Sequence, residues 1–301
     1  MPGGYPIFPF EPRRSRYPLG MNNLIGVCSW SLQPSGPEEL AERVRSLGLS
    51  TVQLALDPVR RGEWPVERTL PVLQEAGIGV HSGMMGTLGE DYSTLETIRV
   101  TGGVVSDEHW DENLHATEEN ARLAADLGLD LVSLHAGFLP EKPGPDRQKL
   151  VERLRLVADR FADLGVRTAL ETGQERAPTL LGFLEELDRP TVGVNFDPAN
   201  MILYDKGDPI EALDALAGHV LQIHIKDACR TKTSGTWGEE VVSGTGQVDW
   251  NAFFSLLRRH DLSVDLMIER EAGSDRIGDI AAAKRMIELH KIGSHSVGGT
   301  S

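Results

Sequence analysis

Short apolar runs alternate with longer amphipathic stretches along most of this chain. The short runs are rich in Val, Ile and Leu, and their length is typical of buried strands. We predict strands at residues 24–30, 51–56, 78–84, 131–135, 167–172, 192–197, 220–227 and 264–270. Between them, apolar residues recur at three- and four-residue spacing, which predicts helices. Examples are residues 37–47, 112–127, 146–164, 208–216, 250–259 and 279–290.

Several predicted helices end in a glycine just before the next strand, at Gly48, Gly77, Gly128 and Gly165. Glycine adopts the left-handed conformation that commonly stops a helix. Strands that each lead into a helix predict a parallel sheet, and a series of such units favours closure into a barrel. We therefore predict the α/β class and a single (β/α)8 TIM barrel. The alternative, a doubly wound sheet, lacks its Gly-rich phosphate fingerprint, because residues 244–246 are more typical of a turn.

The two ends of the chain differ from the predicted barrel, which we place at residues 23–292. Residues 1–22 contain repeated prolines that interrupt any periodicity, so we predict a flexible N-terminal arm. Residues 293–301 are rich in Gly and Ser, a composition that predicts a disordered tail.

Composition narrows the classes of function. The chain has 301 residues, of which 40% are hydrophobic and 25% charged, as is ordinary for a soluble globular protein. No apolar run approaches the length of about 20 residues that a membrane span needs. The net charge of −15 argues against nucleic acid, because phosphate binding needs clustered Lys and Arg. Cys28 and Cys229 form no CxxC pattern, so we expect two buried thiols in a reducing cytoplasm. The oligomeric state stays open, and a homo-oligomer is compatible with the sequence.

Polar residues follow five of the predicted strands at their carboxyl ends, where barrel enzymes carry their active sites. They are His135, Glu171, Asp197, His224 and Glu269. Three carboxylates at close range would resist ionisation, and a divalent cation removes that conflict. Three oxygen donors and one imidazole suit manganese, cobalt or magnesium better than a structural zinc site. The pattern alone leaves open that these are unrelated polar loop residues.

Several motifs lie in order along the chain and make the pattern specific. They are Leu-His-Ala-Gly at 134–137, Leu-Glu-Thr-Gly at 170–173, Phe-Asp-Pro-Ala-Asn at 196–200, His-Ile-Lys-Asp at 224–227, Gly-Thr-Gly-Gln-Val-Asp-Trp at 244–250, and Ile-Glu at 268–269. With them, the sequence resembles the sugar phosphate isomerase/epimerase family of xylose isomerase-like TIM barrels over roughly residues 24–290. That family includes ketose 3-epimerases, inosose dehydratases and endonuclease-IV-type DNA-repair enzymes. The resemblance implies one divalent metal on Glu171, Asp197, His224 and Glu269, with Mn²⁺ expected and Co²⁺ or Mg²⁺ as alternatives.

The branches of this family differ at positions that bind substrate or further metals. DNA-repair members need additional histidines, and this chain has Asn200 and Glu240 at those places. Ketose 3-epimerases are more similar, because Arg230 matches their substrate-binding arginine. Their second Glu falls at Ala177, for which Glu175 is a nearby substitute, and Asn200 replaces a substrate-binding His. These departures bear on the identity of the sugar and leave the class of chemistry in place.

The expected function is metal-dependent proton transfer on a sugar of the ketose 3-epimerase type. A metal that polarises a carbonyl stabilises an enediolate, and Glu171 and Glu269 are the catalytic groups that remove and return the proton. Expulsion of a leaving group instead would make the protein a lyase or dehydratase acting on a keto-sugar, inosose or 3-keto-glycoside. A third alternative is a catalytically silent, metal-holding sugar-binding subunit.

Four further residues are candidates for substrate contact beside Glu175, Asn200 and Arg230. His135 and Lys226 belong to the motifs at the strand ends, whereas His81 and Trp30 come from other strands. For each of them, a structural role in the core or an ion pair is the competing interpretation. The expected partner is a small sugar or keto-sugar, with neither nucleic acid nor membrane.

Overall fold

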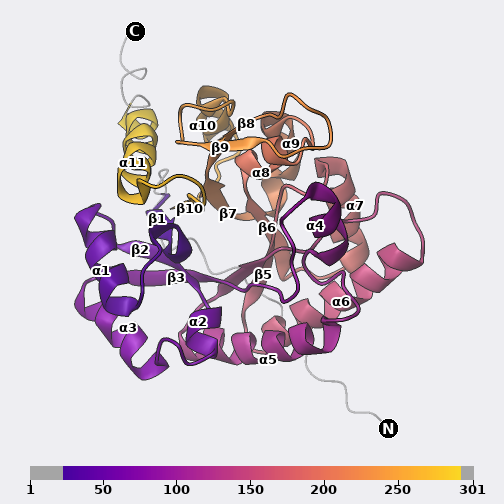
Figure 1. Cartoon of the computed structure of the whole chain (residues 1–301), viewed down its shortest axis with the longest axis horizontal. Helices are drawn as coiled ribbons and strands as arrows, with labels where there is room; N and C mark the ends of the chain where they lie inside the picture. Colours follow the sequence, from indigo (N-terminus) through magenta and orange to yellow (C-terminus); the bar gives the residue numbers. More distant parts are fainter. Residues whose placement is uncertain (1–22, 293–301) are drawn as a thin grey trace.

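The computed structural model describes residues 23–292, which form a closed barrel of parallel strands inside a ring of helices (Figure 1). Around the barrel the strands follow the order β1-β10-β7-β6-β5-β4-β3-β2. Their bounds are β1 (Ile25–Cys28), β2 (Thr51–Ala55), β3 (Gly79–Met84), β4 (Leu131–Leu134), β5 (Arg167–Glu171), β6 (Val192–Phe196), β7 (Val220–Ile225) and β10 (Asp265–Ile268). The predicted (β/α)8 barrel is therefore confirmed.

The helices pack around the strands, and a small antiparallel pair of strands lies beside them. The α-helices are α1 (Pro37–Ser46), α2 (Asp57–Arg60), α3 (Val66–Glu75), α4 (Leu95–Thr101), α5 (Trp110–Asp126), α6 (Pro145–Ala162), α7 (Ala177–Leu187), α8 (Pro198–Leu203), α9 (Pro209–Leu216), α10 (Trp250–Arg259) and α11 (Arg276–Ile292). The 3-10 helices are η1 (Ser29–Leu32) and η2 (Ala217–His219), and the extra strands are β8 (Asp227–Cys229) and β9 (Glu239–Val241). On α6, Leu150, Leu154, Val157 and Phe161 are buried, which is the predicted apolar face.

Four glycines stop helices as the sequence predicted. Gly48, Gly77, Gly128 and Gly165 have φ angles of 61°, 74°, 70° and 76°, which lie in the left-handed region. A side chain would be strained there, so glycine allows the chain to turn directly into the next strand. The segment at 244–246 is a turn, also as predicted.

Two strand predictions need correction. The segment 24–30 forms the short strand β1 and then the 3-10 helix η1, so Trp30 lies in a turn above the barrel. The segment 220–227 ends as a barrel strand at Ile225 and continues into β8. Cys28 and Cys229 are both free, but only Cys28 is buried, whereas Cys229 is half-buried. The predicted arm and tail lie outside the described residues.

The barrel interior carries a layer of polar side chains below the carboxyl ends of the strands. Gln53 donates to the Ser133 hydroxyl at 2.6 Å, and Ser82 donates to Gln222 at 2.5 Å. Gln222 in turn donates to Asn195 at 3.4 Å. Barrel interiors are usually filled by branched apolar residues. This hydrogen-bonded layer gives the centre above it a polar floor.

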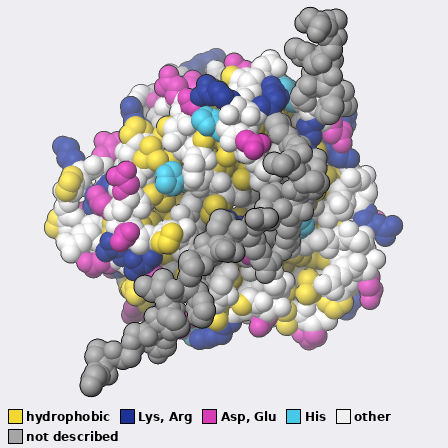
Figure 2. Space-filling model, turned by 180° about the vertical axis from the view of Figure 1, so that it is seen from behind, with side chains coloured by type: hydrophobic (Ala, Val, Ile, Leu, Met, Phe, Trp, Pro, Cys, Tyr) yellow, Lys and Arg dark blue, Asp and Glu magenta, His cyan; other side chains and the backbone are white. Residues whose placement is uncertain are grey.

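The described part of the chain has no helix that could span a membrane, and the face drawn in Figure 2 shows no cluster of basic side chains among the described residues. No helix between residues 23 and 292 is long and apolar enough to cross a bilayer. On the face drawn in Figure 2, acidic and basic side chains of the described residues are interspersed. Binding to nucleic acid requires clustered positive charge, which this face does not present.

Candidate metal centre

Four ionisable side chains meet at the carboxyl ends of four barrel strands. Glu171 ends β5, Asp197 follows β6, His224 lies in β7 and Glu269 follows β10. One ligand-type atom from each lies within 4.8 Å of the others. All four side chains are buried. Parallel strands bring their carboxyl ends to one end of a barrel, and the fold thereby gathers the set of residues that the sequence singled out.

The two ring nitrogens of His224 have different neighbours. Nε2 lies 2.7 Å from Oε1 of Gln53. The amide nitrogen of Gln53 donates to the carbonyl of Gly83 at 3.3 Å, which orients the Gln53 oxygen toward His224. An amide oxygen only accepts, and the Gln53 contact is shorter than the 3.0 Å contact of the Asn195 amide nitrogen with the same Nε2, so in the neutral ring it favours a proton on Nε2 and a lone pair on Nδ1. That lone pair faces Oε1 of Glu171 at 3.3 Å and Oε2 of Glu269 at 3.4 Å.

The two carboxylate oxygens of Asp197 have different roles, since one caps a helix and the other faces the centre. Oδ1 accepts from the amides of Ala199 at 2.8 Å and Asn200 at 2.9 Å, and so caps α8. Pro198 takes the first helical position, where an amide hydrogen is not needed. Oδ2 has no hydrogen-bond partner. The Asp-Pro-Ala-Asn motif therefore begins a helix and leaves one carboxylate oxygen for a ligand.

Glu171 contacts two predicted substrate-binding residues. Its Oε1 accepts from the amide of Asn200 at 2.9 Å, and its Oε2 lies 3.2 Å from Nε2 of His135. On the other side of the imidazole ring, Nδ1 lies 2.8 Å from the Tyr92 hydroxyl and 3.7 Å from the Glu90 carboxylate. Burial alone would lower the pKa of His135, but Tyr92, Glu171 and Glu90 raise it well above its usual range. His135 is therefore an imidazole that readily holds a proton beside Glu171.

Glu269 has both carboxylate oxygens hydrogen-bonded. Trp30 Nε1 donates to Oε1 at 2.9 Å, and Lys226 Nζ donates to Oε2 at 2.9 Å. The buried ammonium of Lys226 also donates to Glu271 at 2.5 Å and to Asn200 at 3.3 Å. Burial would lower the pKa of Lys226, but the charges of Glu269 and Glu271 raise it well above its usual range. The structure thus places Trp30 and Lys226, both predicted substrate contacts, directly at the centre.

The unpartnered atoms of this cluster test whether a divalent cation fits. Oδ2 of Asp197 and Nδ1 of His224 are buried without a hydrogen-bond partner, and Oε2 of Glu171 makes no well-aligned hydrogen bond although His135 Nε2 lies 3.2 Å away. Such atoms are rare and costly in folded proteins. Burial also raises the pKa of Asp197 well above its usual range, against the opposing charge of Lys226. Neighbouring ligands of an octahedral ion with bonds of about 2.1 Å lie about 3 Å apart. The spacing of 3.3–3.8 Å from His224 Nδ1 to the three carboxylates is close to this value. The donor set fits a divalent ion.

A second grouping at the same place includes a thiol. Cys28 Sγ lies 3.6 Å from Nε2 of His224, and both residues lie within ligand spacing of Glu269. Burial raises the pKa of the Cys28 thiol to about 12, so the thiol stays protonated in the described structure. Nε2 of His224 is also the nitrogen that Gln53 engages. The grouping with Glu171 and Asp197 is therefore the better site for a hard cation.

The carboxylate of Asp227 explains why two sequence motifs occur together. It accepts hydrogen bonds from the amides of Gly244 at 2.9 Å, Gly246 at 3.0 Å and Val248 at 3.1 Å, and from Trp250 Nε1 at 3.0 Å. A Cβ at Gly246 would lie 2.2 Å from this carboxylate, which explains the glycine. Asp227 thus holds the loop before α10 in place. The other two polar residues of the His-Ile-Lys-Asp motif, His224 and Lys226, contact the carboxylates of the centre.

Glu175 lies in a cavity next to the centre, on the loop that follows β5. Burial raises the pKa of its carboxyl group from 4.5 to about 8, while the charges of Lys206 and His135 oppose this shift. The loop depends on Gly173, which has a φ of 141°. A Cβ there would lie 2.3 Å from the Cβ of Asn200. This close approach packs the Glu175 loop against the first turn of α8.

The structure does not bring two predicted substrate contacts to the centre. His81 Nδ1 pairs at 2.9 Å with Asp265, the first residue of β10, at the opposite end of the barrel. Arg230 is exposed and binds the carboxylate of Asp205 and, at 3.1 Å, the carbonyl of Gly207. His81 lies in the amino-terminal half of β3, away from the carboxyl ends of the strands. The Arg230 side chain points away from the centre, toward Asp205. Neither side chain therefore lies at the centre in this structure.

Sequence reasoning missed residues of two kinds. Gln53, Asn195 and Gln222 are amides inside apolar strand segments, and this break in an apolar run was a signal that could have found them. Asn195 and Gln53 lie 3.0 Å and 2.7 Å from Nε2 of His224. Glu90 and Tyr92 lie in an irregular loop after β3. No local pattern marks them, because it is the pairing of β3 with β4 that brings this loop to His135.

Comparisons with known proteins agree with this geometry. The family model described as a xylose isomerase-like TIM barrel matches residues 41–290. The chain is 24% identical over 269 residues to L-ribulose 3-epimerase of Methylomonas sp. (strain DH-1), covering 83% of this chain and 82% of that protein. It is 31% identical over 125 residues to the uncharacterized protein YihM of Escherichia coli (strain K12), covering 40% of this chain and only 38% of that protein. The crystal structure of a xylose isomerase domain protein from Planctomyces limnophilus is 32% identical with a TM-score of 0.79, covering 89% and 96% of the two chains.

Proposed function

The chain belongs to the family of xylose isomerase-like TIM barrels, and from this premise we propose that it is a divalent-metal-dependent sugar isomerase or epimerase. The observation that carries the proposal is a set of buried metal-ligand atoms on Glu171, Asp197 and His224, which make no hydrogen bond and lie next to Glu269. The similarity to L-ribulose 3-epimerase supports the same class of chemistry. The substrate we propose is a ketose or keto-sugar, with epimerisation beside its carbonyl.

The four side chains Glu171, Asp197, His224 and Glu269 would hold the ion, for which we propose manganese, with cobalt or magnesium as alternatives. Such an ion supplies Lewis acidity, which polarises a carbonyl and stabilises the negative charge that develops on its oxygen. Hard oxygen donors and one imidazole suit these ions.

Glu171 and Glu269 are the proposed proton-transfer groups. Their strands β5 and β10 are separated by β6 and β7 in the barrel, so the two carboxylates approach the centre from different directions. One removes a proton from the carbon beside the carbonyl, and the other returns a proton to the opposite face of that carbon. Inversion at that carbon is epimerisation.

The residues around these carboxylates orient the sugar. Asn200 offers an amide beside Glu171, and Lys226 places an ammonium beside Glu269. Both can hydrogen-bond a substrate oxygen. The half-buried Trp30 adds an apolar ring 6.1 Å from that of His224, and His135 places a second donor at Glu171.

A lyase or dehydratase is the alternative, and one observation favours it. His135 lies 3.2 Å from Glu171, and Tyr92, Glu171 and Glu90 raise its pKa well above its usual range against the opposing effect of burial. An imidazolium in this position could protonate a departing hydroxyl or sugar after Glu171 has removed the carbon-bound proton. Both reactions begin with the same deprotonation and differ in whether a leaving group departs.

Turnover in heavy water tests the shared step and separates the two outcomes. We would incubate ketoses, inososes and 3-keto-glycosides with the manganese-loaded protein. Epimerisation places deuterium on the inverted carbon, whereas elimination gives an unsaturated product. Replacing Glu171 or Glu269 with Gln should reduce exchange about 100-fold or more, as expected for the loss of an acid–base group. An active substrate that turns over without loss of a carbon-bound proton would refute the proposal.

A further inference from the structure

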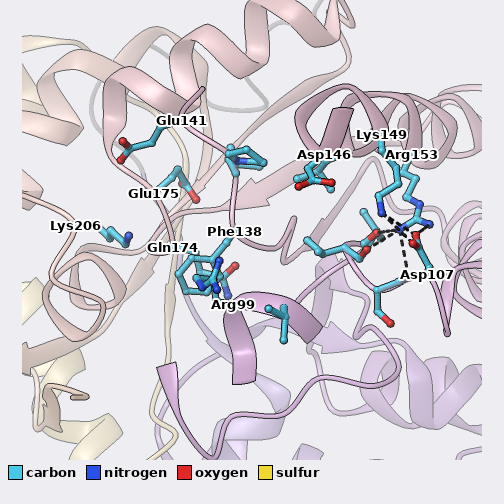
Figure 3. Close-up of a pocket in the computed structure, with 17 residues that line it drawn as sticks. Arg99, Asp107, Phe138, Glu141, Asp146, Lys149, Arg153, Gln174, Glu175 and Lys206 are labelled. Carbon is cyan, nitrogen blue, oxygen red and sulfur yellow. Dashed lines mark hydrogen bonds and ion pairs between the residues drawn. The ribbon is translucent and has the colours of Figure 1, made fainter. Parts of the chain in front are cut away.

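A cavity of about 630 Å³ adjoins the centre, between α4, the start of α6 and the loops that follow β4 and β5 (Figure 3). Its volume lies within the range of roughly 300–1,000 Å³ that is typical of ligand sites. The four residues of the metal centre do not line it. A monosaccharide held at that centre would therefore leave this space unused.

On one wall of the cavity, the charged side chains form ion pairs with one another. Asp107 binds Lys149 at 2.9 Å and also the guanidinium of Arg153 (Figure 3). Arg153 further donates to the carbonyls of Val104 at 2.9 Å and Val105 at 2.7 Å. Lys149 and Arg153 thus bind groups of the loop that precedes α5. This wall consequently offers an anionic ligand little free positive charge.

The opposite wall combines an aromatic ring with polar groups that have room for a ligand. Figure 3 shows Phe138, Gln174, Glu175 and Lys206 together on this side. Lys206 Nζ lies 5.4 Å from the centre of the Phe138 ring. Glu175 is only 7% exposed, and its carboxyl group lines the cavity. A ring for apolar C–H surfaces beside an amide, a carboxyl group and an ammonium suits a neutral, polyhydroxylated ring.

This wall is continuous with the metal centre through the chain and through an aromatic cluster. Phe138 lies three residues beyond His135, a separation of at most about 11 Å along the chain. The Phe138 ring packs on Tyr204 at 5.7 Å, and Gln174 donates to the Tyr204 hydroxyl at 3.4 Å. Tyr204 in turn packs on Trp237 at 4.9 Å, and Trp237 lies 6.5 Å from the ring of Tyr92, whose hydroxyl lies 2.8 Å from His135 Nδ1. These contacts link the cavity wall to His135, which lies 3.2 Å from Glu171 at the centre.

We propose that the cavity is a second sugar subsite, which holds the non-reacting ring of a substrate larger than a monosaccharide. The inference rests on the proposed function, since it assumes that the reacting sugar lies at the metal centre. It assigns the substrate to keto-sugars that carry a glycosyl group. The Phe138 ring stacks against the second ring, while Gln174, Glu175 and Lys206 bind its hydroxyls.

Binding measurements on the magnesium-loaded protein test this subsite. The probes are D-fructose and two disaccharides that contain it, lactulose and isomaltulose, which carry the second ring on O4 and O6. We expect at least one disaccharide to bind 10-fold or more tightly than fructose in calorimetric titration. Glu175→Leu and Val100→Trp should lower this ratio toward one. The first removes a polar group, and the second places a bulky ring on an exposed residue at the cavity.

Leu289→Trp is the matched control, because Leu289 is an exposed apolar residue on α11 that does not line the cavity. It should leave the ratio unchanged. Equal affinity for fructose and both disaccharides would overturn the subsite, as would a ratio that neither cavity variant changes. Tight disaccharide binding without any hydrogen exchange at carbon would instead contradict the proposed function and leave the subsite standing. Hydrogen exchange at a carbon of fructose, together with equal affinity for fructose and the disaccharides, would support the proposed function and overturn the subsite.

Discussion

The side-chain oxygen of Gln53 on β2 lies 2.7 Å from Nε2 of His224 on β7, and this short contact engages the imidazole nitrogen that faces away from the carboxylates of the centre. Outer partners of this kind orient metal-binding histidines, and their loss typically weakens metal binding about 10- to 100-fold. We expect Gln53→Leu to weaken manganese binding by that factor, measured by titration calorimetry. The nitrogen NMR shifts of His224 should also show a mixture of tautomers.

Gln222→Leu is the control for this prediction. It removes an amide from the same buried layer, and Gln222 reaches His224 only indirectly, through Asn195, so the loss of metal affinity should be smaller than in Gln53→Leu. Equal losses of metal affinity in the two variants would mean that Gln53 acts only through the packing of the barrel.

Asp197→Asn should abolish tight metal binding and leave the fold intact. The amide oxygen still caps α8, whereas the second position now carries an NH₂ group that cannot bind a cation. A ligand present at 100 times its Kd stabilises the folded state by about 2.7 kcal/mol. The variant should therefore lose the rise in Tm that manganese gives to the parent protein. Asp208→Asn, which alters the equivalent cap of α9 far from the centre, should keep that rise. A metal content of one ion per chain in Asp197→Asn would refute the ligand assignment.

Asn200→Ala should reduce turnover much more than Arg230→Ala, although the sequence suggested similar roles. Asn200 donates to the Glu171 carboxylate, and a hydrogen bond to a charged group is worth about 1.5–3 kcal/mol, or roughly 10- to 100-fold in rate. Arg230 is exposed and makes an ion pair with Asp205, a kind of contact worth about 0–1 kcal/mol. Turnover of an active sugar at saturating metal measures both. A larger loss in Arg230→Ala would show that this side chain leaves the rim to bind substrate.

Glu175→Gln should change how stability depends on pH. Burial raises the pKa of Glu175 from 4.5 to about 8 in the folded protein, against the charges of Lys206 and His135. The folded state then holds a proton that the unfolded state releases, so the contribution to stability is full below about pH 4.5 and falls as pH rises toward 8. The loss amounts to at most about 1.4 kcal/mol per pH unit.

Urea unfolding at pH 5, 6.5 and 8 measures this dependence. Glu175→Gln should lose less stability than the parent protein between pH 5 and 8. Parallel curves for the two proteins would show that Glu175 is ionised throughout, held by Lys206. Glu141→Gln, at another cavity-lining carboxylate that is exposed, is the matched control and should follow the parent curve.

The sequence by itself determined the barrel and singled out the four residues that the fold brings together in the candidate metal centre. Runs of branched residues followed by amphipathic stretches fix a parallel βα alternation, because each pattern suits only one periodicity. Glycines such as Gly48 and Gly165 mark helix ends, since the left-handed conformation there is a local property of the backbone. Asp197 and Glu269 could be singled out because they directly follow apolar strands, and in a barrel all strand ends meet on one face.

Only the tertiary structure decided what surrounds these residues. Gln53 and His224 are far apart in the chain, and their contact depends on two strands facing each other across the interior of the barrel. Glu90 and Tyr92 reach His135 from a loop without any repeating pattern. The same limit applies to Arg230, whose side chain lies at the rim with Asp205, because a motif fixes a position along the chain but not the direction of a long side chain. Side-chain direction depends on which partners lie within reach, and barrel closure sets those partners.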